Sequence, residues 1–158
     1  MRIGFASDIH RLVKGRFLIL SGVVIPYELG EEAHSDGDVV YHAVAESILG
    51  ALALGDLGKH FPDSDPQYKN IDSSIIVKKV VSMMKERGYA INNIDVSITL
   101  EKPKLKDYIS QMRNNLADLL ETFVGNVSIK AGTNEGVGPL GRNEAVKAEA
   151  IVLLTEEK

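Results

Sequence analysis

Three residues in the first third of the chain could together bind a zinc ion. Asp8 and His10 are two positions apart in a segment that predicts a strand, so their side chains point to the same face. His42 follows in a predicted helix and can approach from the other side. Carboxylate oxygen and imidazole nitrogen both bind zinc, and three protein ligands leave the fourth tetrahedral position open. An open position favours a catalytic site over a structural one.

Each of these residues also has an ordinary structural explanation. Asp8 and His10 could be a solvent-exposed pair on a strand, and His60 is expected to be a surface residue. His42 is harder to explain in this way, because it interrupts an apolar helix and each buried ring nitrogen needs a partner. Asp38, one turn earlier, could be the N-cap of that helix or the acceptor that orients His42. A zinc phosphoesterase and a scaffold with a structural zinc ion therefore stay open as alternatives.

Two other groups of polar residues could bind a ligand. Asp56, Asp63 and Asp65 lie in loops or at helix starts, where aspartate caps the backbone or binds the hydroxyl groups of a sugar or polyol. The segment 130–136 predicts a strand that runs into small and hydroxyl residues, whose backbone N–H groups could bind phosphate while Glu135 holds a hard cation. This segment matches neither the P-loop nor the dinucleotide-binding pattern.

The elements that must position these residues predict an α+β fold. We expect a single mixed four-stranded sheet with helices layered on one face and a short N-terminal hairpin extension. The predicted strands are 2–10, 17–25, 89–100, 127–131 and 145–154, with a turn at Lys14-Gly15, and the predicted helices are 38–54, 73–87 and 106–121. A sheet with helices on one face leaves the other face uncovered, and a symmetric oligomer would cover it.

Length, charge and composition narrow the classes of protein. With 158 residues we expect one domain spanning 1–158. The absence of cysteine excludes thiolate metal sites and disulfides and agrees with a reducing compartment. A net charge of −4 argues against nucleic-acid binding. The start of the chain does not have the pattern of a signal peptide and no stretch is long enough to span a membrane, so we expect a cytoplasmic protein without a membrane partner.

Taken together, the motifs resemble the 2-C-methyl-D-erythritol 2,4-cyclodiphosphate synthase family. The resemblance runs in order through almost the whole chain. It rests on these segments: Asp8-x-His10, His34-Ser35-Asp36-Gly37-Asp38, His42, the segment 55–66, Pro103-Lys104, and the segment 130–142 from Lys130-Ala131-x-Thr133-x-Glu135 to Gly141-Arg142. In combination these motifs are much more specific than any one of them alone.

The resemblance implies a phosphorus–oxygen lyase of the non-mevalonate isoprenoid pathway. Such an enzyme cyclises 4-diphosphocytidyl-2-C-methyl-D-erythritol 2-phosphate, a cytidine diphosphate substrate, with loss of CMP. It also implies a homotrimer whose sheets face the three-fold axis and whose active sites lie at the subunit interfaces. Zinc and a second divalent cation, magnesium or manganese, are the implied metals.

By the same resemblance, specific residues take specific roles. Asp8, His10 and His42 are the implied zinc ligands, and Glu135 lies near the second cation. The implied catalytic residues are His34 and Thr133, which orient and stabilise the diphosphate. The implied substrate-binding residues are Asp8, His10, His34, Ser35, Asp56, Leu57, Gly58, Phe61, Asp63, Asp65, Leu100, Pro103, Lys104, Leu105, Lys106, Gly132, Thr133, Asn134, Glu135, Pro139 and Arg142. The segments around residues 100–106 and 132–142 come from the neighbouring subunit.

The chain departs from the family pattern at a few positions. Glu46 stands where aspartate is usual, and we expect this longer side chain to change helix packing. Gly132 and Asn134 replace threonines on either side of Thr133, which leaves the backbone N–H groups to contact phosphate there. Pro139 replaces a residue that is commonly aromatic.

Overall fold

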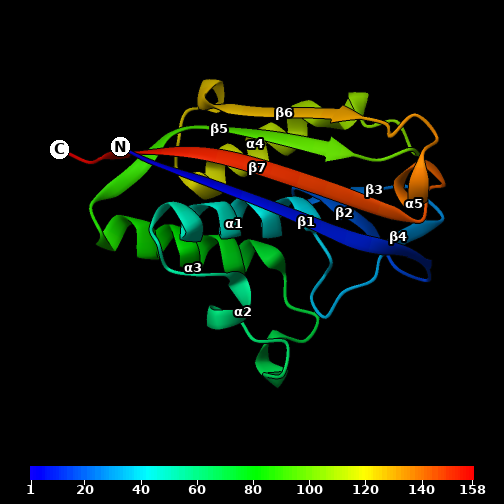
Figure 1. Ribbon diagram of the computed structural model, residues 1–158, viewed down its shortest axis with the longest axis horizontal. Coiled ribbons are helices and arrows are strands. Elements are labelled where there is room, and N and C mark those ends of the chain that lie inside the picture. The colour runs from blue at the N-terminus through cyan, green and yellow to red at the C-terminus, as the bar shows by residue number, and fades with distance from the viewer.

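The structure, a computed structural model that describes residues 1–158, is built on one mixed sheet (Figure 1). The five strands lie in the order β4-β1-β7-β5-β6, with β5 and β6 parallel and the other neighbours antiparallel. Their bounds are Arg2–Lys14 for β1, Leu29–Glu31 for β4, Tyr89–Thr99 for β5, Val127–Gly132 for β6 and Ala145–Glu156 for β7. The mixed sheet is confirmed, but the prediction of four strands is wrong. The additional strand, β4, pairs with only three residues of β1, which is too short for a periodic sequence signal.

The prediction of one continuous strand over residues 17–25 is wrong, because this segment folds into a hairpin. It forms β2 (Leu18–Leu20) and β3 (Val23–Ile25), a separate two-stranded sheet. The two residues between them, Ser21 and Gly22, have φ angles of 48° and 74°. Two consecutive positive φ angles are typical of the tight two-residue turn that joins antiparallel strands. The predicted turn at Gly15 is confirmed, but the strand that pairs with β1 after this turn is β4 and not the segment 17–25.

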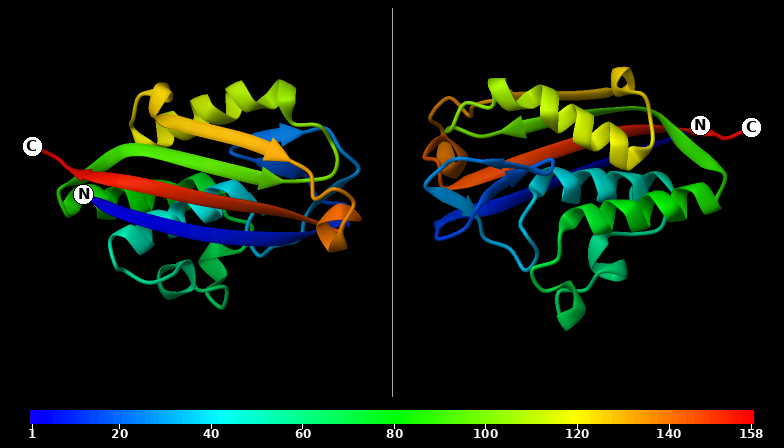
Figure 2. Two further views of the ribbon diagram at one scale, coloured as in Figure 1. Left: turned by 45° about the horizontal axis from the view of Figure 1, so that its top comes forward. Right: turned by 180° about the vertical axis from the view of Figure 1, so that it is seen from behind.

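Three helices cover one face of the sheet, as Figure 2 shows from both sides. They are α1 (Val39–Ala51), α3 (Ser73–Glu86) and α4 (Ile109–Leu120). Helix α1 is buried on most of its circumference, as its sequence predicts. It packs very close to β1: a Cβ atom on Gly4 would lie 1.9 Å from the backbone oxygen of Ser47. Glycine therefore allows the approach that brings helix α1 against Asp8 and His10.

The helix bounds differ slightly from the prediction. Helix α1 ends at Ala51 and not at residue 54, because Ala53 adopts a left-handed conformation with φ of 57°. Predicted loops contain the short helices α2 (Leu57–His60) and α5 (Gly138–Gly141) and two of the three 3₁₀ turns, Pro66–Tyr68 and Val124–Asn126. The third turn, Lys106–Tyr108, forms the start of the predicted helix 106–121. No helix combines the length and the apolar character needed to cross a membrane.

The other face of the sheet is open and partly apolar. Ile3, Phe5 and Ile9 on β1 are 71%, 58% and 54% exposed, and Ile151 on β7, the register partner of Phe5, is 47% exposed. These residues alternate along their strands with positions that are more buried, on the side of the helices. The predicted uncovered face is therefore present, and it carries large apolar side chains that a monomer exposes to water.

Candidate functional site

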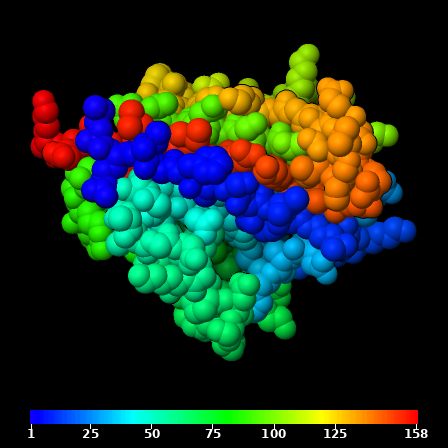
Figure 3. Space-filling view, in the orientation of Figure 1, coloured from blue at the N-terminus to red at the C-terminus, as the bar shows by residue number.

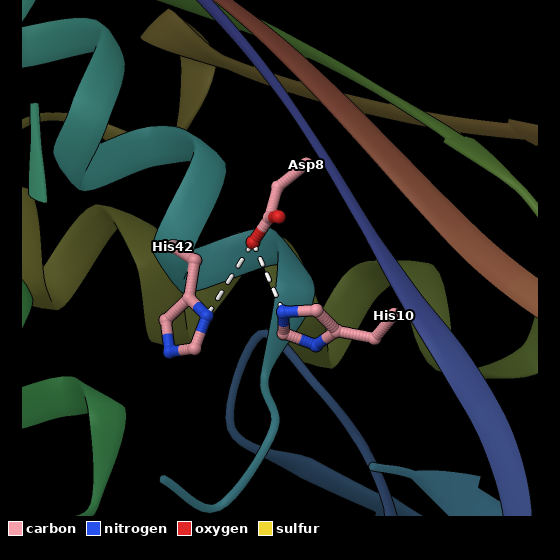
Figure 4. A group of neighbouring side chains, drawn as sticks. All are labelled: Asp8, His10 and His42. Carbon is pink, nitrogen blue, oxygen red and sulfur yellow. Dashed lines mark ion pairs between the residues drawn. The ribbon is translucent and has the colours of Figure 1, made fainter. Parts of the chain in front are cut away.

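Asp8, His10 and His42 converge on the helix side of the sheet (Figure 4). Asp8 and His10 occupy alternate positions of β1, and His42 lies on the first turns of α1. Asp8 Oδ2 is 3.1 Å from His10 Nε2 and 3.5 Å from His42 Nδ1. One potential ligand atom from each residue lies within 4.8 Å of the others. The predicted grouping of these three residues is confirmed.

The charges and hydrogen bonds of this cluster suit a cation. Burial alone would raise the pKa of the Asp8 carboxyl, but the hydrogen bonds and charges of His10 and His42 outweigh it and hold that pKa well below its usual range. Burial alone would lower the pKa of His10, but the hydrogen bond and charge of Asp8 raise it. In the metal-free protein, a proton on the His10 imidazole therefore compensates the carboxylate, and a divalent cation can take its place.

The ring orientation of His10 is set by the loop before α1. Its Nδ1 lies 2.7 Å from the backbone oxygen of Gly37. A carbonyl oxygen only accepts, so this nitrogen donates and carries a proton. Nε2 faces Asp8 and donates to its carboxylate in the metal-free protein, and it is the nitrogen that can offer a lone pair to a metal ion once this proton is lost. A metal ligand held in this way by a carbonyl on its second nitrogen is common in metal sites. The donor set and its orientation thus fit a zinc ion with an open coordination position.

These residues line a cavity of about 530 Å³, here called the metal-side cavity. Figure 3 shows it as a hollow between β1 and the segment that contains α2. Of the predicted site residues it contains Asp8, His10, His34, Ser35, His42, Leu57, Gly58, Phe61 and Asp63. The Nε2 atom of His34 is buried and has no hydrogen-bond partner in the protein. Because buried polar atoms are almost always paired, this nitrogen is suited to a polar group of a ligand.

Two predicted aspartates are instead engaged with the backbone. Asp56 is the N-cap of α2 and accepts from Lys59 N at 3.0 Å. Asp65 caps the turn Pro66–Tyr68 and accepts from Gln67 N at 3.1 Å. Neither residue lines the metal-side cavity. Their capping role agrees with the ordinary explanation of these side chains, and a contact with substrate stays a prediction.

Asp38 is the N-cap of α1, and its side chain makes no bond to the His42 ring. Its carboxylate accepts from Tyr41 N at 3.1 Å, from Ser21 N at 3.0 Å and from Gly22 N at 2.8 Å. Burial raises the pKa of Asp38 to about 6, although these backbone donors oppose the shift. Burial and the charge of Asp38 also raise the pKa of Glu31 well above its usual value. The alternative that Asp38 orients His42 is therefore wrong, and the carboxylate instead connects the β2-β3 hairpin to α1.

A second hollow of about 300 Å³, here called the strand-end cavity, lies at the carboxyl ends of the parallel strands β5 and β6. Ligands often bind at such strand ends in α/β sheets. It contains the predicted residues Leu100, Pro103, Lys104, Leu105, Lys106, Gly132 and Thr133. It shares no residue with the metal-side cavity, so within one chain the predicted site residues form two separate groups.

The remaining predicted residues lie beyond the strand-end cavity. Asn134 and Glu135 are exposed; Asn134 N donates to Glu101 Oε2 at 3.2 Å, and Glu135 has a φ angle of 52°. Pro139 is exposed on α5, and Arg142 pairs with Glu144 at 3.3 Å. None of these side chains is held in a buried position.

Three residues support the metal-side cavity that the sequence did not predict in this role. Glu46, expected to affect packing, lines the cavity and accepts from Leu57 N at 3.1 Å, which ties α1 to α2. Arg16 donates to the backbone oxygen of Ser35 at 2.8 Å. Ser73 Oγ lies 2.9 Å from His42 Nε2. Only Glu46 has a sequence signal, since it is four residues after His42 and so on the same helix face.

The comparisons with known proteins agree along the whole chain. The model of the YgbB family matches residues 1–155. The 2-C-methyl-D-erythritol 2,4-cyclodiphosphate synthase of Brachyspira hyodysenteriae is 53% identical over 158 residues, which is 100% of each chain. The enzyme of the same name from Carboxydothermus hydrogenoformans is 50% identical over 99% of this chain and 96% of its own. A solved structure of a synthase of this name, in a form with CDP bound, has a TM-score of 0.90 at 34% identity and covers 98% of this chain and 100% of that one.

Proposed function

This chain belongs to the YgbB family, and we propose that it cyclises 4-diphosphocytidyl-2-C-methyl-D-erythritol 2-phosphate to 2-C-methyl-D-erythritol 2,4-cyclodiphosphate with release of CMP. The observation that carries the proposal is the cluster of Asp8, His10 and His42 beside the unpaired nitrogen of His34, in one cavity. An enzyme that catalyses this reaction is a phosphorus–oxygen lyase of the non-mevalonate isoprenoid pathway.

The reaction is a transfer of a phosphoryl group within one molecule. An oxygen of the 2-phosphate forms a bond to the β-phosphorus, and the bond from that phosphorus to the bridging oxygen breaks. CMP leaves with the electron pair of that bond. Because a phosphate oxygen is already ionised at neutral pH, no strong general base is needed. The protein has to orient the two phosphates and compensate their charge.

The side chains of the metal-side cavity are suited to this task. A zinc ion held by Asp8, His10 and His42, together with magnesium or manganese near Glu135, would supply Lewis-acid stabilisation of the phosphate charge. His34 lines the same cavity, and its unpaired Nε2 can donate to a diphosphate oxygen. Ser35, on the same loop, can place its hydroxyl near that oxygen. Leu57, Gly58, Phe61 and Asp63 surround the space for the methylerythritol part.

The other half of the substrate would bind in the strand-end cavity of a second subunit. The walls formed by residues 100–106 are suited to a cytosine ring, and the exposed loop of residues 132–135 to the diphosphate. Thr133 would assist His34 in orienting the diphosphate. Arg142 and Pro139 lie further along the same loop. A complete site then needs two copies of the chain.

The quaternary structure that fits is a homotrimer whose sheets face the axis. The apolar residues Ile3, Phe5, Ile9 and Ile151 on the open face of the sheet support this arrangement, because assembly would remove them from water. We expect residues 1–158 to act as one domain, and a cytoplasmic location remains a prediction. Phe5→Glu places a charge on the open face, so it should dissociate the oligomer in sedimentation velocity while the subunit stays folded. A variant that stays trimeric would contradict the placement of this face at the axis.

An assay of the purified protein with the diphosphocytidyl substrate and Mg²⁺ tests the activity. We expect stoichiometric release of CMP and a cyclic diphosphate, identified by ³¹P NMR. Inactivation by a zinc chelator, reversed by added Zn²⁺, should accompany it. Release of inorganic phosphate would instead favour a zinc phosphoesterase and would overturn the proposal.

A further inference from the structure

The second ring nitrogen of His42 faces a pair of hydroxyl groups. In Figure 4, His42 directs Nδ1 toward Asp8 and the other nitrogen away from it. That nitrogen, Nε2, lies 2.9 Å from Ser73 Oγ and 3.1 Å from Ser35 Oγ. Ser73 is fully buried at the first residue of α3. Metal ligation through Nδ1 requires a lone pair on that atom, so the partners of Nε2 decide whether the ring can bind a metal.

The direction of the hydrogen bond between Ser73 and His42 follows from Asp36. Ser73 Oγ lies 2.5 Å from Asp36 Oδ1, and a carboxylate only accepts, so the serine donates its single hydroxyl proton to Asp36. The serine oxygen can then only accept from His42. His42 Nε2 must therefore carry the proton, and its Nδ1 keeps the lone pair. Ser35 does not determine this choice, because no carboxylate fixes its hydroxyl proton.

The carboxylate of Asp36 is itself fixed by the backbone. Its Oδ1 accepts from Asp38 N at 3.1 Å, and its Oδ2 accepts from Ser73 N at 3.1 Å. In addition, Asp36 N donates to the backbone oxygen of Ile71 at 3.0 Å. These bonds connect the loop of His34 and Ser35 to the start of α3. The side chain of Asp36 is therefore held in one orientation, in which its carboxylate oxygens accept hydrogen bonds.

We propose that Asp36 and Ser73 are positioning residues that hold His42 with its proton on Nε2, so that Nδ1 is free to bind the metal ion. The proposal rests on the metal site of the proposed function. Asp8 Oδ2 lies 3.5 Å from His42 Nδ1 and favours a proton on that nitrogen. The hydrogen bonds that link His42, Ser73 and Asp36 favour the proton on Nε2 instead. Partners that orient a metal-binding histidine typically contribute 10- to 100-fold, roughly, to metal affinity.

Ser73→Ala is the principal test, with Ser74→Ala as its matched control. The alanine removes the acceptor for His42 but keeps the bond from the backbone N of residue 73 to Asp36. Asp72 still caps α3 through Ser74 N at 2.9 Å, so we expect the helix to persist. Ser74 has the same residue type and is the next residue of α3, but its side chain makes no bond to His42. Zinc affinity should therefore fall in the first variant only.

Asp36→Asn tests the direction of the hydrogen bonds that link Asp36, Ser73 and His42. Both carboxylate oxygens accept from backbone N–H groups, so the amide NH₂ must face a donor or the hydroxyl of Ser73. If the amide donates to Ser73, the serine hydroxyl turns to His42 Nε2 and favours the proton on Nδ1, the nitrogen that should bind metal. The loss of zinc affinity should then be at least as large as in Ser73→Ala. Should this variant fail to fold, Ser73→Ala still decides.

Two measurements without substrate test the proposal. The zinc dissociation constant, from competition with a chelator, should rise roughly 10- to 100-fold in Ser73→Ala and stay unchanged in Ser74→Ala. In the zinc-loaded protein, the ¹H–¹⁵N spectrum of the histidine rings should show an Nε2 proton of His42 that exchanges slowly with water. That proton should exchange faster in Ser73→Ala.

The outcomes separate this proposal from the synthase activity. Equal zinc affinity and equal proton exchange in Ser73→Ala and the unchanged protein would overturn the role of Ser73, even if CMP release is observed. The expected loss of affinity would support that role even if the substrate assay fails. No zinc binding by the unchanged protein would overturn this proposal together with the metal site.

Discussion

The metal-side cavity and the strand-end cavity differ in how firmly one chain holds their side chains. In the first, His10 and His42 are largely buried, with side chains 12% exposed, and each has partners on both ring nitrogens. In the second, Thr133 and Glu135 are exposed, and Glu135 lies at a turn with positive φ. The metal-side cavity is thus organised within a single subunit.

This difference indicates what each half of the site needs for its function. A metal centre requires ligands that are oriented before the ion binds, and hydrogen bonds to the loop between β4 and α1 and to the start of α3 supply this orientation. The loop at the end of the parallel strands is exposed, and Asn134 N and Glu135 N bond only to nearby side chains of the same subunit. A second copy of the chain packed against this loop would enclose it. Changes on the two sides should therefore have different consequences, and they can be ordered by size.

The largest effect on zinc binding and activity is expected from His42→Ala, which changes only the metal-side cavity. Loss of one of three ligands should abolish zinc binding and reduce kcat by roughly 10³-fold, because the charge of the transferred phosphoryl group is no longer compensated. The subunit should stay folded and assembled, since the core of α1 does not depend on the metal. Metal analysis and thermal unfolding of the purified variant check both statements. A variant that keeps zinc would show that the ligand set is wrong.

Mixed oligomers of two inactive variants should regain activity. His42→Ala damages the metal-side cavity and Thr133→Ala the strand-end cavity, so a site between one subunit of each kind can have two intact halves. Coexpression with two different tags, followed by purification on both, isolates such oligomers. Each trimer that carries both tags has one intact site, about a third of its sites, so its activity should be far above that of either variant alone. No recovery would place the complete site within one subunit.

The pH dependence of stability should reveal the two buried carboxylates beside the start of α1, Asp38 and Glu31. Burial raises the pKa of Asp38 to about 6 from the model-compound value of 3.8. The folded protein therefore binds more protons than the unfolded chain between these values, and the free energy of unfolding falls as the pH rises through this window. The contribution is on the order of 3 kcal/mol.

The matched variant is Asp38→Asn, studied without metal by urea unfolding at pH 4 to 7. Asparagine keeps a cap on α1 but cannot ionise, so the curve of the wild type should decline relative to that of the variant. Because Asp38 also raises the pKa of Glu31, the difference reports on the two carboxylates together. Parallel curves would show that neither carboxyl is shifted by burial.

The smallest effect is expected at Glu46, at the edge of the metal-side cavity. Glu46→Ala removes the acceptor for Leu57 N, a hydrogen bond that contributes about 1 kcal/mol. Because Leu57 and Gly58 line the metal-side cavity, where the sugar part is proposed to bind, KM should rise a few-fold while kcat changes less. Glu46→Gln keeps an acceptor oxygen and should resemble the wild type. Equal kinetics of all three proteins would limit Glu46 to packing.

The sequence predicted the grouping of the three possible metal ligands, because the signal was local. The alternation of Asp8 and His10 and the polar interruption of the apolar helix at His42 indicated residues that the structure brings together. The segment 17–25 was misread, because Ile19 and Val24 continue a strand pattern across Ser21-Gly22. What holds that turn is Asp38, 17 residues from Ser21, and no periodicity reports such a contact.

The supporting residues were beyond the reach of the sequence for the same reason. Ser73 lies 31 residues from His42 and 37 from Asp36, and a serine beside the N-cap of a helix is ordinary in itself. Asp38 was the obvious candidate to orient His42, because it precedes it by one helical turn. The structure turns Asp38 toward the β2-β3 hairpin and gives the contact to Ser73.

The sequence by itself determined which chemical groups are present and on which face of a strand or helix they lie, since side-chain direction follows from backbone periodicity. Only the tertiary structure decided which partners face the two ring nitrogens of His10 and His42, and that the predicted site residues line two separate cavities. Both depend on hydrogen bonds and packing between segments far apart in the chain, which local periodicity does not encode.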